Sequence, residues 1–258
     1  MPIYDTWCEQ QQEQHGSRTY VTLTEKAGGR AAIGAELGQT LRSHYDRRER
    51  IADDIARLGY PAASEILRAL LPVSPRARSG DLGEVLASEL VEEKTTFRIP
   101  VRRMRYKDGR EVAMQGDDFI GARHDQQGLS LAKGEAKSRQ NLAAATIKEA
   151  RDALTRHDGR CTPDSLLFVA NRLLESADLD EQALGRTIRD EVGLRALPAN
   201  RIDHILFTMS GNAPPAALKD DLIATADGRN QTTINLRIVD HQAFIEEAYQ
   251  RAADLGNF

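Results

Sequence analysis

The stretch DDFIGARHDQQGLSLAKGEAKS, residues 117–138, carries two acidic residues ahead of one apolar run and a Glu-Ala-Lys triplet near the end of another. Charge at such positions costs stability unless it is paired or binds something. Alternate side chains of a strand share a face, so Glu135 and Lys137 project the same way. If the preceding strand pairs antiparallel through a turn at 125–128, Asp118 lies opposite Glu135. The spacing predicts two carboxylates and an ammonium group at one edge of a sheet.

This set of groups suits metal-dependent hydrolysis of a phosphodiester. Mg²⁺ takes oxygen ligands, usually one or two carboxylates with water and substrate phosphate. We expect Asp118 and Glu135 to be metal ligands, with the backbone carbonyl of Ala136 as a third and Mn²⁺ able to substitute. Lys137 would position the attacking water and help to stabilise its deprotonated form. Glu84, on a preceding helix, could complete the site through water or a second metal.

Each of these residues also has an ordinary structural interpretation. Charged residues make up 29% of the chain, so an E-x-K triplet also arises on a solvated strand or helix face. Asp117 and Asp118 could form a turn, and Glu84 could face solvent on a capped helix. Asp117 competes with Asp118 as the ligand, and we prefer Asp118 because it directly precedes the apolar pair Phe119-Ile120.

The elements that must hold these groups follow from hydrophobic periodicity and turn residues. Around the site, the pattern predicts a helix, a three-stranded meander and a second helix. The expected elements are a helix beginning at Ser79 or Asp81, strands over 97–106, 111–123 and 129–137, a hairpin turn at 108–109, and a helix over 140–157. Further strands are expected at 19–25, 202–210 and 232–240. The run 72–80, rich in Pro, Ser and Gly, predicts a boundary between an N-terminal accessory region, 1–78, and a main domain, 79–258.

Composition excludes several classes of protein. No apolar stretch approaches the roughly 20 residues that a membrane span requires, and the polar N-terminus lacks the order of a signal peptide. Cys8 and Cys161 are too few for a disulfide framework, which makes a cytoplasmic location the default expectation. The six scattered histidines show no zinc-binding spacing. With a net charge of −4, any nucleic-acid binding must come from a local basic surface.

One such basic segment precedes the acids. Its members are Arg98, Arg102, Arg103, Arg105, Lys107 and Arg110. Alternation along the expected strand puts Arg103, Arg105 and Lys107 on one face, which could bind DNA phosphates beside the metal site. A solvated strand edge that charge protects from aggregation, or a surface for an acidic partner, explains the same residues.

The order of these residues resembles the PD-(D/E)xK nuclease superfamily. DFIG at 118–121 stands where that superfamily has an aspartate followed by apolar residues, and GEAK at 134–137 stands for its (D/E)xK, although no proline precedes the aspartate. The resemblance implies a restriction-endonuclease-like α/β core, in which helices flank a central mixed sheet, here with an N-terminal accessory helical region. Gln140 matches a glutamine often found on the helix after E-x-K, where it could contact backbone or DNA. A polar residue in the first turn of a helix explains it equally well.

Longer strings are similar to the effector nuclease subunit of Hachiman anti-phage defence systems. They are SPRARSGDLGEVLASEL, RMRYKDGREVAMQGDDFIG, LAKGEAKSRQ and TIKEARDAL, within residues 74–172. This resemblance implies a metal-dependent DNase without a small-molecule cofactor, paired with a superfamily 2 helicase subunit that keeps it inactive until phage replication or damaged DNA is sensed. It places Asp118, Glu135 and Lys137 at catalytic positions and Glu84 as the helix acid. The alternative is a nuclease fold that serves only as a DNA-binding or scaffolding subunit, with structural acids.

Overall fold

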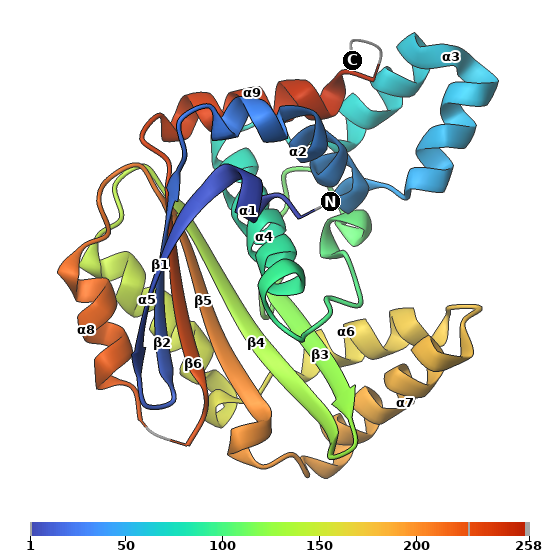
Figure 1. Ribbon diagram of the computed structural model, residues 1–258. Helices are drawn as coiled ribbons and strands as arrows, with labels where there is room; N and C mark the ends of the chain where they lie inside the picture. Colours follow the sequence, from blue (N-terminus) through green and yellow to red (C-terminus); the bar gives the residue numbers. More distant parts are fainter. Residues whose placement is uncertain (1, 227, 256–258) are drawn as a thin grey trace.

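A six-stranded mixed sheet with helices on both faces forms the centre of the molecule, as the computed structural model shows for residues 2–226 and 228–255 (Figure 1). The strand order is β1-β2-β6-β5-β4-β3. The strands are β1 (Cys8–His15), β2 (Arg18–Glu25), β3 (Phe119–Asp125), β4 (Gly128–Arg139), β5 (Ile202–Ser210) and β6 (Gln231–Arg237). Antiparallel hairpins β1–β2 and β3–β4 form the two outer pairs, and the inner pairs are parallel. The predicted α/β class with a mixed sheet is confirmed.

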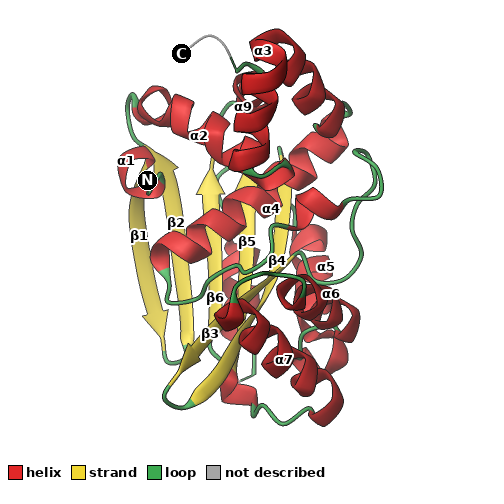
Figure 2. Cartoon of the chain, turned by 90° about the vertical axis from the view of Figure 1, so that its right-hand side faces the viewer, coloured by secondary structure: helices red, strands yellow, loops and turns green. Residues whose placement is uncertain are grey.

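Two helical layers bury the two faces of the sheet. The helices are α1 (Tyr4–Trp7), α2 (Gly29–Tyr45), α3 (Arg48–Leu70), α4 (Pro75–Lys94), α5 (Ala144–Thr155), α6 (Pro163–Leu174), α7 (Leu179–Leu194), α8 (Ala216–Ala224) and α9 (His241–Ala253), with single 3-10 turns at η1 (Arg103–Tyr106), η2 (Arg156–Gly159) and η3 (Ala199–Arg201). One layer contains α1, α2, α4 and α9, and the other contains α5 and α8. Helices α6 and α7 pack at the β3 side of the sheet (Figures 1 and 2).

Strand β5 carries apolar residues on both faces because helices cover both faces, whereas β6 buries Thr233 and Asn235 on one of its faces. In β5, Leu206 packs against α5 and α8, and the next residue, Phe207, packs in the opposite layer. Continuous apolar runs are typical of parallel strands that helices bury on both sides. Strands predicted at 19–25, 202–210 and 232–240 correspond to β2, β5 and β6.

Helix α4 crosses one face of the sheet and carries Glu84. It begins at Pro75, after Ser74, whose side chain accepts a hydrogen bond from the Ala77 N–H. The prediction of Ser79 or Asp81 as the N-cap is therefore wrong, because proline in the first turn lets the helix begin one turn earlier. The helix runs across the boundary that we placed at residue 78, and β1 and β2 extend the same sheet as β3–β6. The division at residue 78 stays a prediction.

The three-stranded meander is wrong in its first member. Within the predicted strand 97–106, only Arg98 pairs with a strand, in an isolated antiparallel bridge to Ala122, and the chain then forms η1. Pro100 offers no N–H donor for a continued ladder. The second strand begins only at Phe119, because Gly116 takes a φ of +95° that breaks the extended path. What remains of the meander is the β3–β4 hairpin.

The N-terminal region carries both helices and strands. Helix α3 projects from the rest of the molecule (Figures 1 and 2) and is interrupted at Gly59, which has a φ of +79°. Of the helices in the described part of the chain, none has the length and apolar character needed to span a bilayer. Cys8 and Cys161 are both buried free thiols.

Candidate active site

The E-x-K triplet lies on β4, and its charged side chains point toward α5. Glu135 Oε1 lies 2.8 Å from Lys137 Nζ, and Lys137 Nζ also lies 3.2 Å from Glu149 Oε1 on α5. Glu135 is only 7% exposed. The predicted alternation is confirmed, since both groups share one face while Ala136 packs against the opposite layer.

Asp118 is held against this triplet by two backbone hydrogen bonds. Its N–H donates to the Gly134 carbonyl (3.2 Å), and its carboxylate accepts from the Ala136 N–H (2.7 Å). In a strand, the N–H and C=O of one residue point to the same side. The Ala136 carbonyl therefore points to the edge where Asp118 lies, beyond the last β3–β4 pair of Phe119 with Gly134.

The glycine of GEAK has a packing role at this edge. A Cβ atom at Gly134 would lie 2.1 Å from Cζ of Phe119, so no larger residue fits while the Phe119 ring keeps its place. Because Phe119 directly follows Asp118, this close contact fixes the start of β3 against β4. The packing thus sets the position from which Asp118 reaches Ala136.

Glu84 approaches from the opposite layer. Helix α4 packs closely on β4 at this turn, where a Cβ at Gly83 would lie 3.2 Å from the Ser138 side chain. The Glu84 carboxylate lies 3.6 Å from the guanidinium of Arg103. Burial and the nearby charge of Asp118 raise the pKa of Glu84 well above its ordinary value. Glu84 and Asp118 therefore share one electrostatic environment.

Burial raises the pKa values of all three acids, and the charge of Asp118 adds to the shift of Glu84 and of Glu135. Burial, followed by the charge of Asp118, raises the pKa of Glu135 to about 7. Burial also raises the pKa of Asp118, against the hydrogen bond from Ala136. Burial alone would lower the pKa of Lys137, but the adjacent Glu135 outweighs burial and leaves it above its ordinary value. Carboxyl groups with raised pKa values are those that an added cation stabilises in ionised form.

These groups fit a hard divalent cation. Asp118 and Glu135 supply carboxylates, and the Ala136 carbonyl points to the same edge. Across residues 2–226 and 228–255, no three His, Cys, Asp or Glu side chains form a ready metal-binding group. A metal here would therefore be held by two carboxylates, with a backbone carbonyl and water completing the shell, which is the pattern that Mg²⁺ favours.

Asp117 has a structural role, so the geometry favours Asp118 as the ligand. Its carboxylate accepts from the N–H (2.7 Å) and the hydroxyl (2.9 Å) of Thr162, at the start of α6. Lys133 Nζ lies 3.7 Å away, and Asp117 itself is 4% exposed. A buried carboxylate that accepts hydrogen bonds at the N-terminus of a helix in this way has a structural role.

Gln140 does not lie on a helix. It is an exposed loop residue, and α5 begins at Ala144. Its backbone carbonyl accepts a hydrogen bond from the Gly211 N–H (3.0 Å). The helical position that we assigned to it is wrong because α5 begins four residues later than the sequence pattern indicated, after a loop over 140–143.

The basic segment folds inward instead of forming a charged strand face. Arg103 donates to the carbonyls of Asp117 and Gln115, and Arg105 donates two hydrogen bonds to the Ser43 carbonyl (2.6 and 3.0 Å). Lys107 Nζ lies 2.7 Å from the Asp81 carboxylate, and its side chain is 4% exposed. The strand alternation behind the expected DNA-binding face is therefore wrong, since these side chains contact the protein itself.

Two residues near the site were missed from the sequence. Glu149 contacts Lys137, and the charge of exposed Arg156, at the end of α5, acts on Glu135. Glu149 lies on the helix after E-x-K and Arg156 directly follows that helix, but only the packing of α5 shows which of its residues face β4. The spacing of Ile147 and Leu154, both buried against the sheet, is the signal that could have oriented the helix.

The fold and the site define a class of protein: an α/β protein with a six-stranded mixed sheet, in which acids and a lysine gather at one edge. The model of the HamA family matches residues 1–252, so the chain belongs to the HamA family. A curated relative, the Hachiman protein HamA of Bacillus cereus, is 26% identical over 183 residues. That match spans 71% of this chain but only 64% of the relative's length. The family resemblance seen in the sequence is confirmed.

Proposed function

We propose that this protein is a Mg²⁺-dependent DNase and the effector of a Hachiman anti-phage defence system. Membership of the HamA family supports the place in the defence system, and the printed name of the Bacillus cereus relative supports it further. The partner would be a superfamily 2 helicase subunit that keeps the nuclease inactive until phage replication or damaged DNA is sensed.

The observation that carries the proposal is the meeting of Asp118, Glu135 and Lys137 at one sheet edge. The carboxylate of Asp118 accepts a hydrogen bond from the backbone N–H of Ala136, the residue between Glu135 and Lys137. Glu135 and Lys137 form an ion pair. Burial and the charge of Asp118 raise the pKa of Glu135 to about 7, and a bound cation would stabilise its ionised form.

Each residue has a role in the proposed reaction. Asp118, Glu135 and the Ala136 carbonyl would hold Mg²⁺, which when bound supplies a Lewis acid for the phosphoryl oxygens. The Lys137 ammonium would hold a water molecule for in-line attack and stabilise its deprotonated form by charge. Glu84 would hydrogen-bond a water molecule beside Asp118 from the α4 side.

A plasmid-cleavage assay with the purified chain tests this proposal. We expect cleavage with Mg²⁺ or Mn²⁺, no cleavage with a chelator, and no cleavage by Glu135→Gln. Glu65→Gln is a matched control, because Glu65 is an exposed glutamate on α3 whose side chain is 71% exposed. Cleavage by Glu135→Gln at the wild-type rate, with Glu65→Gln unchanged, would overturn the assignment.

A second candidate function is a nuclease fold that serves only as a DNA-binding or scaffolding subunit. The ion pairs of Lys137 with Glu135 and Glu149 favour it, because they leave the lysine satisfied without any ligand. Toxicity on expression separates the two functions. The nuclease predicts a toxic wild type and a harmless Glu135→Gln variant, whereas the scaffold predicts that both are harmless.

A further inference from the structure

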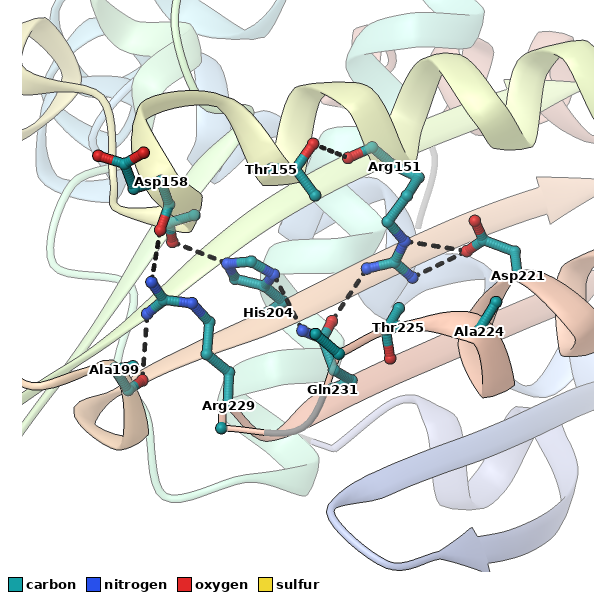
Figure 3. A pocket seen from close by; sticks show the side chains of 13 residues that line it. Arg151, Thr155, Asp158, Ala199, His204, Asp221, Ala224, Thr225, Arg229 and Gln231 are labelled. Carbon is teal, nitrogen blue, oxygen red and sulfur yellow. Dashed lines mark hydrogen bonds and ion pairs between the residues drawn. The ribbon is translucent and has the colours of Figure 1, made fainter.

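A cavity of about 420 Å³ lies away from the acidic edge, at the amino ends of β5 and β6 (Figure 3). The ends of α5 and α8 close it on the outer side of the sheet. The residues that matter here are Arg151, His204, Asp221, Ala224, Arg229 and Gln231. A cavity of this size suits a small organic ligand.

One chain of hydrogen bonds fixes the floor of the cavity. The Asp221 carboxylate accepts from Nε (3.0 Å) and Nη2 (2.9 Å) of Arg151, and Arg151 Nη1 donates to Gln231 Oε1 (2.9 Å). Gln231 Nε2 lies 3.2 Å from His204 Nδ1, and His204 Nε2 lies 2.8 Å from the Gly159 carbonyl. A carbonyl partner requires the proton on Nε2, so Nδ1 accepts from Gln231 and the imidazole is neutral. The floor is rigid, polar and without net charge.

The wall of the cavity carries a positive charge that the floor does not offset. Arg229 donates to the carbonyls of Asp158 (2.5 Å) and Ala199 (3.1 Å), both neutral acceptors. Arg151 differs, because Asp221 balances its charge. In residues 2–226 and 228–255, no carboxylate oxygen lies within 4 Å of the Arg229 guanidinium. A partly buried guanidinium in this state favours an anionic ligand.

The backbone beside Arg229 is held in an uncommon conformation. His157, Asp158 and Gly159 have φ values of +58°, +58° and +71° in succession. Left-handed backbone is strained at non-glycine residues and persists where surrounding contacts require it. Here the turn directs the carbonyls of Asp158 and Gly159 to Arg229 and His204. The strained turn therefore shapes the cavity wall.

We propose that this cavity binds a small organic phosphate of mononucleotide size. Its phosphate would pair with Arg229, and its heterocyclic body would lie between Ala224 and the floor formed by His204 and Gln231. The Asp158 carboxylate, which also lines the cavity, is exposed and pairs with Arg195 (3.5 Å). Arg229 beside a neutral polar floor matches one phosphate group on an uncharged body. The cavity uses none of the residues of the acidic edge, so binding here is independent of DNA cleavage.

Calorimetric titration of the full chain with AMP, adenosine and inorganic phosphate tests the site. We expect saturable AMP binding, with affinity at least about tenfold lower in Arg229→Gln, because a charged hydrogen bond is lost. Arg229→Lys should be intermediate, since it keeps the charge. Ala224→Trp should abolish AMP binding by filling the cavity. Arg186→Gln, an exposed change on α7, should bind as wild type does.

Three results would overturn the proposal. The first is the absence of AMP binding up to about 10 mM by folded wild-type protein. The second is equal affinity of AMP for wild type, Arg229→Gln and Ala224→Trp, with thermal melting showing that each variant is folded. The third is equal affinity for inorganic phosphate and AMP, which would remove the role of the organic body.

Discussion

The acidic edge and the basic segment contrast most clearly in this molecule. The acidic edge comprises Glu84, Asp118, Glu135 and Lys137, and the basic segment spans residues 98–110. Both are dense in charge and close in sequence. In the basic segment, the fold supplies acceptors for Arg103, Arg105 and Lys107. At the acidic edge, burial and the charge of Asp118 raise the pKa values of Glu84 and Glu135. Charge that the fold pairs has a structural role, whereas the buried acids of the acidic edge are where we expect a cation to bind.

The largest expected effect is a difference in DNA-cleavage rate between substitutions of two lysines, Lys137 and Lys148. Lys137→Met should reduce DNA cleavage by at least about a thousandfold, because it removes the cation that would hold the attacking water. Lys148→Met should leave the rate within about twofold, since Lys148 lies on the exposed face of α5, where its side chain is 76% exposed and pairs with Asp152. Rates come from a time course of plasmid cleavage in Mg²⁺. Equal rates for the two variants would remove the distinction between the two regions.

The next effect is on stability, and it should appear in the basic segment. Lys107→Met should lower the free energy of unfolding by about 3–5 kcal/mol, because the buried Asp81 carboxylate keeps the Tyr45 hydroxyl but loses its cation. The exposed pair of Lys148 with Asp152 should contribute less than about 1 kcal/mol. Urea denaturation measures both. A loss below about 1 kcal/mol in Lys107→Met would contradict the structural role of the basic segment.

Glu135→Gln should stabilise the metal-free protein in a pH-dependent way. The folded-state pKa of Glu135 is raised to about 7, so its protonated form favours folding at low pH. That contribution is full below the unfolded pKa of about 4.3 and is lost as the pH rises through 7. At pH 8, with chelator present, the free energy of unfolding of the variant should exceed that of wild type by about 1–3 kcal/mol. The loss of the ion pair between Glu135 and Lys137 reduces this gain. Thermal melting from pH 4 to pH 8 measures the change, and a constant difference would contradict the shifted pKa.

Arg105→Gln should have the smallest effect on DNA binding. Its guanidinium already donates two hydrogen bonds to the Ser43 carbonyl. We expect DNA affinity to change by less than about threefold and the salt dependence to stay the same. A salt slope reduced by about one would restore Arg105 as a phosphate contact. Filter binding at several salt concentrations decides this.

The local sequence pattern predicted some elements correctly because their structure does not depend on specific contacts with distant residues. The apolar run at 202–210 is β5, since burial on both faces needs only apolar residues. The E-x-K triplet was placed correctly because strand alternation holds whatever the neighbouring elements are. Its proximity to Asp118 followed from the turn at 125–128.

The structure of the elements that the sequence pattern failed to predict depends on tertiary contacts. CEQQQEQH forms β1, but as an edge strand with exposed residues on both faces it carries no hydrophobic alternation. The basic segment alternates like a strand, yet buried acceptors such as the Asp117 carbonyl and the Asp81 carboxylate draw its cations inward. Such partners are distant in sequence or depend on loop geometry, so single-sequence periodicity does not show them.

The most direct test of the acidic edge is anomalous diffraction from a crystal soaked in Mn²⁺. We predict a peak between Asp118 and Glu135, about 2.1–2.2 Å from their carboxylate oxygens and within reach of the Ala136 carbonyl. A crystal without such a peak, in which Asp118 still accepts from Ala136 and Glu135 still pairs with Lys137, would contradict the assignment.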